Sequence, residues 1–523
     1  MKKFARLIAL ALSSALLLTA CGKSPANTQN PVTSGSSQSG SGASENKTAK
    51  DMIVFSPRLD FATMDVQNTP SIVTKSIYYL VYNTLVEKDV ETNAVIPALA
   101  ESWTKNSATE IVFNLRQGVK FHDGSGFTAA DVKFTYEKAL ESAGSAAKLA
   151  SLQSIETDGD YIVKITLKSP NMDFLDLLTD PSLSIMSKTA FETLGEEKGI
   201  QQGTGPYQYA EWNQGSYLDL EANEAYWGGA PATPKLRVQY ISENSSRLIA
   251  VQTGELDFCQ DPPQAELANI AANPDLQLIT YPSATVDFVA FNLNEAPMDN
   301  PDVRKAIAYA INRQDIIDGV FLGNATELNN IMHFSNAYYS EIEGTEYNVE
   351  KAKELLANAG YADGFELTLA CNTTSDSQAA CTIIQALLDE VGITVKLDVM
   401  ENATLTATMS SGVGYHMCFS RWSGYAFGPD TGIREMLYTG GSNNYGHLSD
   451  PKMDQMIDEA LAIEDEAKRI AAYKAIEEYS DEVMAVYPIL VENYTFVARN
   501  SVENILQPNG PIMNFRELLA YQG

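Results

Sequence analysis

The four histidines of the chain are too scattered to predict a metal site or a catalytic pair. They are His122, His333, His416 and His447, and no two have the close spacing that lets one helix or turn offer two metal ligands. His122 precedes Asp123 in Phe-His-Asp-Gly, but Asp-Gly after an apolar strand is typical of a turn. The sequence therefore predicts no metal and a structural role for His122.

The body of the chain also lacks the short motifs by which common enzymes are recognised. It contains no Gly-x-Ser-x-Gly elbow for a nucleophilic serine. It has neither the phosphate-cradling G-x-x-x-x-G-K-[ST] nor the zinc-binding H-E-x-x-H. These absences argue against the common hydrolases and kinases, and we predict a protein that is not an enzyme and needs no cofactor.

The first twenty residues have the parts of a signal peptide. A basic start precedes an apolar run over 7–18, which is shorter than the roughly 20 residues of a membrane-spanning helix. Cys21 follows Leu-Thr-Ala, which resembles a lipobox, the signal after which a cysteine receives a diacylglyceryl group. We expect 1–20 to be removed and Cys21 to carry a lipid. The alternative is a plain secretory signal with an incidental cysteine.

Residues 21–50 predict a flexible tether, because a segment of Ser, Gly, Asn, Thr and Gln cannot bury enough surface to offset its chain entropy. Such a tether suits a body held off the membrane at the surface of a Gram-positive cell. The formal net charge of −31 argues against nucleic acid as a partner, since its phosphates need clustered Lys and Arg. Solubility accounts for this acidity as well as the steering of cationic solutes does, so we infer no ligand from it.

Four further cysteines are too few and too scattered for a disulfide framework in a chain of 523 residues: Cys259, Cys371, Cys381 and Cys418. A disulfide could join Cys371, at the end of a predicted strand, to Cys381 in the following helix. Buried free thiols are the alternative that we favour.

Hydrophobic periodicity alternates between strand and helix along the body, which predicts an α/β fold. The predicted strands are rich in β-branched or aromatic residues and cover 111–115, 161–167, 236–241, 286–293, 365–370 and 393–399. Two helices are predicted to begin at Asn300-Pro301 and Asp450-Pro451. In both, the first residue can cap free amide groups and proline suits the first turn.

Seven segments in chain order resemble family 5 of the extracellular solute-binding proteins, which serve dipeptide, oligopeptide and nickel ABC importers. They are Tyr-Asn-Thr-Leu-Val at 82–86, Pro-Ala-Leu-Ala-Glu-Ser-Trp at 97–103, the stretch 113–132 around Phe-His-Asp-Gly, Gly-Thr-Gly-Pro-Tyr at 203–207, Asn-Glu-Ala-Tyr-Trp at 223–227, Gly-Glu-Leu-Asp at 254–257, and Phe-Asn-Leu-Asn at 291–294 running into Arg-Lys-Ala-Ile at 304–307.

The resemblance implies a two-lobe periplasmic-binding-protein-like fold of type II with an extra subdomain. Lobe I would combine 51–84, 204–284 and 487–523, with 85–203 as the extra subdomain and 285–486 as lobe II. The lobe crossings then fall near the Gly and Pro residues at 203–206 and 281–283. A solute that contacts both lobes would stabilise the closed state, which the permease and ATPase subunits of the importer can recognise.

The resemblance also implies a pocket formed by a loop of lobe I and a strand of lobe II. The expected ligand-binding residues are Thr69 and Pro70 in the loop, and Arg421, Trp422, Ser423, Gly424 and Tyr425 on the strand. Peptides dock by pairing their main chain with such strands. Trp422 would supply an apolar wall, with ordinary core packing as the alternative.

One position departs from the family pattern. Tyr425 stands three residues after the tryptophan, where peptide-binding members commonly place an acidic residue that pairs with the peptide's ammonium group. Asp430 could replace it, since a tyrosine ring holds a cation more weakly than a carboxylate does. We expect a monomer that binds an oligopeptide. The alternatives are an oligosaccharide, a nickel complex or another small polar solute and, from another class, a surface scaffold or adhesion lipoprotein.

Overall fold

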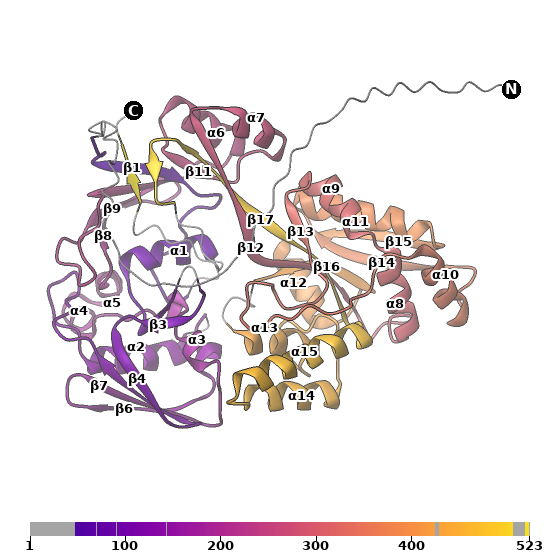
Figure 1. The fold of residues 1–523 in the computed structure, drawn as a ribbon, viewed down its shortest axis with the longest axis horizontal. Helices are drawn as coiled ribbons and strands as arrows, with labels where there is room; N and C mark the ends of the chain where they lie inside the picture. Colours follow the sequence, from indigo (N-terminus) through magenta and orange to yellow (C-terminus); the bar gives the residue numbers. More distant parts are fainter. Residues whose placement is uncertain are drawn as a thin grey trace, which may run out of the picture. The chain divides into compact units, whose positions relative to one another are not determined.

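The computed structural model describes residues 48–68, 71–89, 92–142, 144–423, 428–505 and 518–521. They all belong to one compact unit that begins at Lys47. Helices and strands alternate along it, which confirms the α/β class (Figure 1). Within these ranges, no helix is both long and apolar enough to cross a membrane.

An eleven-stranded mixed sheet dominates the fold. Its order is β15 (Ile393–Met400), β14 (Phe365–Asn372), β16 (Met417–Trp422), β12 (Leu276–Phe291), β17 (Val486–Arg499), β11 (Phe258–Gln260), β1 (Met52–Ser56), β10 (Lys235–Gln239), β9 (Tyr217–Ala222) and β8 (Tyr207–Asn213), with β13 (Ala325–Glu327) paired to β17. The long antiparallel strands β12 and β17 join the two ends of this sheet (Figure 1).

A separate four-stranded sheet has the order β4 (Ala100–Ser107), β5 (Glu110–Leu115), β7 (Ile162–Leu167) and β6 (Leu152–Asp158). Two small pairs complete the strands: β2 (Val86–Lys88) with β3 (Val95–Pro97), and β18 (Val502–Glu503) with β19 (Leu519–Ala520).

The α-helices are α1 (Ile72–Val81), α2 (Ala129–Glu141), α3 (Phe174–Leu177), α4 (Lys188–Leu194), α5 (Glu196–Gly199), α6 (Asn244–Thr253), α7 (Leu267–Ala272), α8 (Pro301–Ala310), α9 (Arg313–Phe321), α10 (Val349–Asn358), α11 (Ser375–Asp389), α12 (Asn402–Ser411), α13 (Pro429–Leu437), α14 (Pro451–Leu461) and α15 (Glu466–Val483). Three short 3-10 helices are η1 (Ala146–Leu149), η2 (Pro181–Leu183) and η3 (Gln264–Glu266).

Buried apolar side chains gather in separate clusters. One lies wholly within 85–185 and packs α2 on the four-stranded sheet. A second surrounds α1 and the β1, β10, β9 and β8 end of the large sheet. Two further clusters contain alternate residues of β12, β14 and β16, so they lie on opposite faces of that part of the sheet. The domain boundaries given above stay predictions.

Local sequence signals placed both predicted helix starts correctly. The Asn300 side chain accepts from the backbone N–H of Asp302, and Asp450 caps α14 in the same way. The prediction for 286–293 was too short, because β12 begins at Leu276. Its pairing with β17 is irregular between Pro282 and Val286, so the strand tolerates the proline that we interpreted as part of a crossing turn.

The turn at 203–206 packs tightly against the end of α1. A Cβ on either Gly203 or Gly205 would overlap the backbone of Val81, so only glycine fits there. The backbone N–H of His122 donates to the Gly203 carbonyl, and Nε2 of the same residue lies 3.1 Å from the Gly205 carbonyl oxygen. Burial lowers the pKa of His122. These contacts give His122 the structural role expected from the sequence.

Candidate ligand-binding site

Arg421 and Trp422 end strand β16 and point to opposite faces of the sheet. Trp422 pairs with Val286 across β12, and its half-buried ring packs against the cluster under α13, α14 and α15. The indole N–H is buried without an acceptor among the described residues. Trp422 therefore takes part in core packing, and its role as an apolar wall of the pocket stays a prediction.

Arg421 is held by two carboxylates of its own chain. Its Nε lies 3.3 Å from Oδ1 of Asp287, and its Nη2 lies 2.6 Å from Oε1 of Glu492. Both distances are those of ion pairs, but Nε and Nη2 of Arg421 do not meet the geometric criteria of hydrogen bonds to these carboxylates. Burial raises the pKa of the fully buried Asp287, and Arg421 opposes this shift. Much of the guanidinium charge is therefore balanced inside the protein.

Arg421 also lines a cavity of about 70 Å³. Arg58 follows β1, Asp261 follows β11 and Asp376 lies in the first turn of α11, just after β14. In α/β sheets, ligands bind in the crevice outside the carboxyl ends of strands, and this cavity has that position. Further residues of its lining are Gln260, Gln264, Val320, Phe321, Glu492, Asn493, Tyr494 and Thr495.

Both signs of charge face this cavity. Arg58 and Arg421 supply two cations, while Asp261, Asp376 and Glu492 supply three carboxylates. Within the described residues, no group of three or more His, Cys, Asp and Glu side chains is placed to hold a metal ion. The cavity itself can offer a charged partner to a cation and to an anion.

The sequence missed Arg58, Asp261, Asp376 and Tyr494 as cavity residues. Their position directly after strand ends was the available signal, but it became useful only once the strand order was known.

Ser423 is the third predicted site residue that the structure describes. Its hydroxyl lies 2.9 Å from Oγ1 of Thr285, next to the pairing of Val286 with Trp422. Arg421, Trp422 and Ser423 thus follow one another at the end of β16, but the side chains of Arg421 and Trp422 face opposite sides of the sheet. The other predicted residues, Thr69, Pro70, Gly424, Tyr425, the side chain of Asp430 and Cys21, lie outside the described part of the chain.

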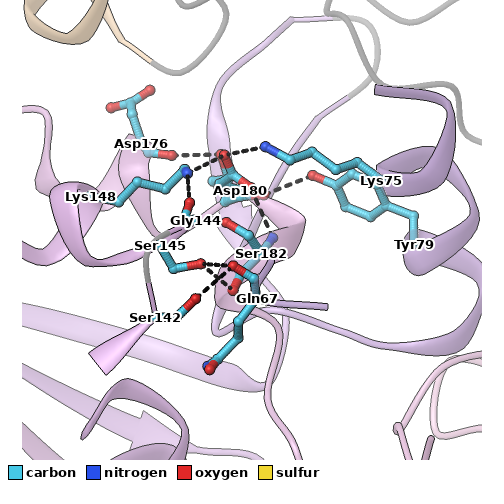
Figure 2. Close-up of polar contacts among 11 residues, drawn as sticks. Gln67, Lys75, Tyr79, Ser142, Gly144, Ser145, Lys148, Asp176, Asp180 and Ser182 are labelled. Carbon is cyan, nitrogen blue, oxygen red and sulfur yellow. Dashed lines mark hydrogen bonds and ion pairs between the residues drawn. The ribbon is translucent and has the colours of Figure 1, made fainter. Parts of the chain in front are cut away.

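Gln67 and Asn68, just before the predicted loop residues Thr69 and Pro70, contact the residues that follow α2. Hydroxyl oxygens of Ser142 and Ser145 lie 3.0 and 2.8 Å from the Gln67 carbonyl oxygen (Figure 2). The Ser142 Oγ is also 2.6 Å from Oδ1 of Asn68. A Cβ on Gly144 would come within 2.5 Å of the same carbonyl oxygen. Ser142, Gly144 and Ser145 therefore fix the backbone that leads into this loop.

Beside these residues, a buried carboxylate joins α1 to η1 and η2. Asp180 lies 3.1 Å from Nζ of Lys75 and 3.7 Å from Nζ of Lys148, and it accepts from the backbone N–H of Ser182 (Figure 2). Burial alone would raise the pKa of Asp180, but the two ammonium groups and Ser182 hold it below its usual value. Lys148 also donates to the carbonyl of Gly144, which ties this ion cluster to the residues that follow α2.

The four cysteines of the body, Cys259, Cys371, Cys381 and Cys418, are buried free thiols in the structure. The disulfide between Cys371 and Cys381 that we considered is therefore not formed here.

Comparison with known proteins points to one family. Bacterial extracellular solute-binding proteins, family 5 (middle part), match residues 94–444. The glutathione-binding protein GsiB of Salmonella typhi is 29% identical over 461 residues, which is 85% of this chain and 89% of that protein.

Solved structures agree in fold. NikA from Brucella suis, in complex with Fe(III)-EDTA, superimposes with a TM-score of 0.82 at 25% identity, covering 90% of this chain and 99% of that one. DppA from Helicobacter pylori, in complex with the peptide STSA, gives 0.78 at 26% identity, covering 92% and 100%. These type II periplasmic binding proteins confirm the two-lobe fold that the motifs predicted. The chain therefore belongs to family 5 of the bacterial extracellular solute-binding proteins, the extracytoplasmic substrate-binding components of ABC importers.

Proposed function

We propose that this protein captures a short peptide or a related zwitterionic solute and delivers it to the permease of its ABC importer. The observation that carries the proposal is the cavity beside Arg421, where two arginines and three carboxylates face one small space. A free peptide has an ammonium and a carboxylate group, so it can offer a partner to each sign of charge. Uncharged sugars offer neither, and a buried charge without a partner is costly.

The relatives support this choice of solute. The Salmonella typhi protein binds glutathione, and the Helicobacter pylori structure holds a peptide of four residues. Both ligands are short peptides. The half-buried Trp422 faces the other side of the sheet and does not line this cavity, so it would contact a part of the solute that extends past the end of β16.

The test is calorimetry of the full-length protein, purified in detergent, with dipeptides, tripeptides and tetrapeptides, together with mass spectrometry of whatever solute co-purifies. We expect a peptide to bind, and Trp422→Ala to weaken its binding at least tenfold. Leu322→Ala is a matched control, since that side chain is 61% exposed. Exclusive binding of oligosaccharides or nickel complexes would contradict the proposal, and turnover of a bound peptide would contradict a role without catalysis.

We also propose that residues 1–20 are removed, that Cys21 carries lipid, and that 21–50 tether a monomeric body to the outside of a Gram-positive membrane. The support is the lipobox-like sequence before Cys21 and the polar composition of the segment after it.

A further inference from the structure

We infer that the four-stranded body, residues 85–185, is a latch that holds the protein closed on its solute. It contacts the helices α13, α14 and α15 and the chain around them at two points, Asn93 and the segment 171–173. The inference goes beyond the proposed function, because it concerns how the protein closes and not which solute it selects.

The four-stranded body is anchored by buried contacts to the half of the protein that contains α1. Phe134 of α2 packs against the apolar cluster around α1. The buried carboxylate of Asp180 lies 3.1 Å from Nζ of Lys75 in α1 (Figure 2). Tyr79, also in α1, donates to the carbonyl of Thr179 at 2.8 Å. Apolar packing and a buried ion pair hold these parts together, so the four-stranded body moves with α1 as one unit.

The contact of the same body with α13, α14 and α15 is of another kind. Among the described residues, no apolar cluster contains side chains both from 85–185 and from these helices. Parts of one chain that share no large hydrophobic interface generally move relative to each other. The contacts described next can therefore break and form again without exposing a hydrophobic core.

Asn93 makes the first contact. Its Nδ2 donates to the carbonyl of Ser335 at 3.1 Å. Asn93 has a left-handed backbone with φ of 58°, and its own carbonyl accepts from Nζ of Lys88 at 3.1 Å. Across the contact, the backbone N–H of Ser335 donates to Nδ1 of the buried His333. Both partners are held in place by their own surroundings, so the bond between them costs little conformational entropy.

The segment 171–173 makes the second contact. The backbone N–H of Met172 donates at 3.4 Å to the carbonyl of Leu461, the last residue of α14, where carbonyls have no partner within the helix. Asp173 is only 1% exposed, and a Cβ on Gly428 would lie 3.5 Å from its Oδ2. Because Gly428 directly precedes α13, this carboxylate lies near the positive end of the helix dipole.

The two points are connected to each other and lie close to the predicted ligand residues in sequence. Lys88, which bonds to the Asn93 carbonyl, also pairs with Asp176 of α3, the helix that follows the segment 171–173. Gly428 stands three positions after the predicted ligand residue Tyr425. A solute that bridges the two halves and the latch both favour the closed state, so each should strengthen the other.

The test is the distance between two spin labels on the full-length protein in detergent, at Glu137→Cys in α2 and Glu459→Cys in α14. Both positions are exposed, whereas the four native cysteines of the body are buried. Electron paramagnetic resonance gives the populations of the short and the long label distance. They are measured without solute and during titration with alanine peptides of two to four residues.

Asn93→Gly, which suits the left-handed backbone, is combined with Asp173→Ala to remove both side-chain contacts of the latch. We expect the ratio of short to long distance to fall at least fivefold, since one lost hydrogen bond changes such an equilibrium about two- to tenfold. Peptide affinity in calorimetry should fall by a similar factor, because fewer molecules occupy the closed state.

Asp158→Ala with Asp160→Ala is the matched control, because both side chains are exposed at the turn between β6 and β7 of the same body. Equal distance ratios in the wild type and the latch variant at every peptide concentration would overturn the latch. A wild type that never shows the short distance would overturn it too. If no peptide binds, the proposed function fails, while the distances measured without solute still test the latch. Thermal unfolding checks that each variant is folded.

Discussion

Replacing Arg421 with methionine removes the guanidinium that lies 3.3 Å from Asp287 and 2.6 Å from Glu492. Methionine keeps an unbranched apolar stem but ends before the guanidinium, so the change removes the charged group and its ion pairs. Because Asp287 is fully buried, it cannot regain water when the cation leaves. Breaking a buried ion pair from one side costs about 3–5 kcal/mol in unfolding free energy.

The loss has an upper limit, because Asp287 can take up a proton. Protonating a carboxyl of ordinary pKa 3.8 costs about 4 kcal/mol at pH 7 and about 1.6 kcal/mol at pH 5, at 1.36 kcal/mol per unit. Burial already raises the pKa of Asp287 in the folded state, and loss of Arg421 raises it further. The native state then holds a proton that the unfolded state releases, so the stability of the variant must fall as pH rises.

Urea unfolding at pH 5 and pH 7 measures this effect. We expect Arg421→Met to lose about 3–4 kcal/mol at pH 7 and less than about 2 kcal/mol at pH 5, and addition of Asp287→Asn to restore most of the loss. Arg434→Met, which breaks the more exposed pair with Asp458, should cost no more than about 1 kcal/mol. A loss from Arg421→Met as small as that control, and independent of pH, would refute the structural role and leave Arg421 free for the solute.

Three further predictions concern other parts of the molecule. Ser142→Ala combined with Ser145→Ala should weaken peptide binding several-fold in calorimetry with little change in melting temperature, because both hydroxyls contact Gln67 before the predicted ligand loop; unchanged affinity would exclude this positioning role. Burial raises the pKa of Glu477 to about 8, so stability should fall as pH rises from about 4.5 to 8, and Glu477→Gln should flatten that slope in urea titrations. Cys21→Ala should move the protein from the membrane fraction to the soluble fraction, and a variant that stays covalently anchored would contradict lipidation.

Signals that act over a few residues were enough to predict much of the fold. Asn300 and Asp450 cap their helices through their own side chains, so their position could be read without tertiary information. The full length of strand β12 could not be predicted from such local signals. Pro282 would normally end a strand, and it is tolerated here only because the pairing of β12 with β17 is irregular at that point. The cavity was beyond sequence reasoning for the same reason: Arg58 and Asp376 are more than 300 positions apart, and only the strand order brings them together.

The site prediction at the end of β16 shows a limit of transferring a motif as a block. Arg421 and Trp422 are neighbours in sequence, but neighbouring residues of a strand face opposite sides, so they cannot share one surface of the sheet. Trp422 packs beside α13, α14 and α15, whereas Arg421 joins Asp287 on the other face and lines the charged cavity.

Two arginines line the same cavity, but only the charge of Arg421 is paired with carboxylates of its own chain. Arg58 has no such ion pair among the described residues. A solute that carries a carboxylate gains more at Arg58, because no described carboxylate lies within ion-pair distance there, whereas at Arg421 it would compete with Asp287 and Glu492. Specificity should therefore depend more on Arg58, which no motif marks, than on the arginine that stands next to the family tryptophan.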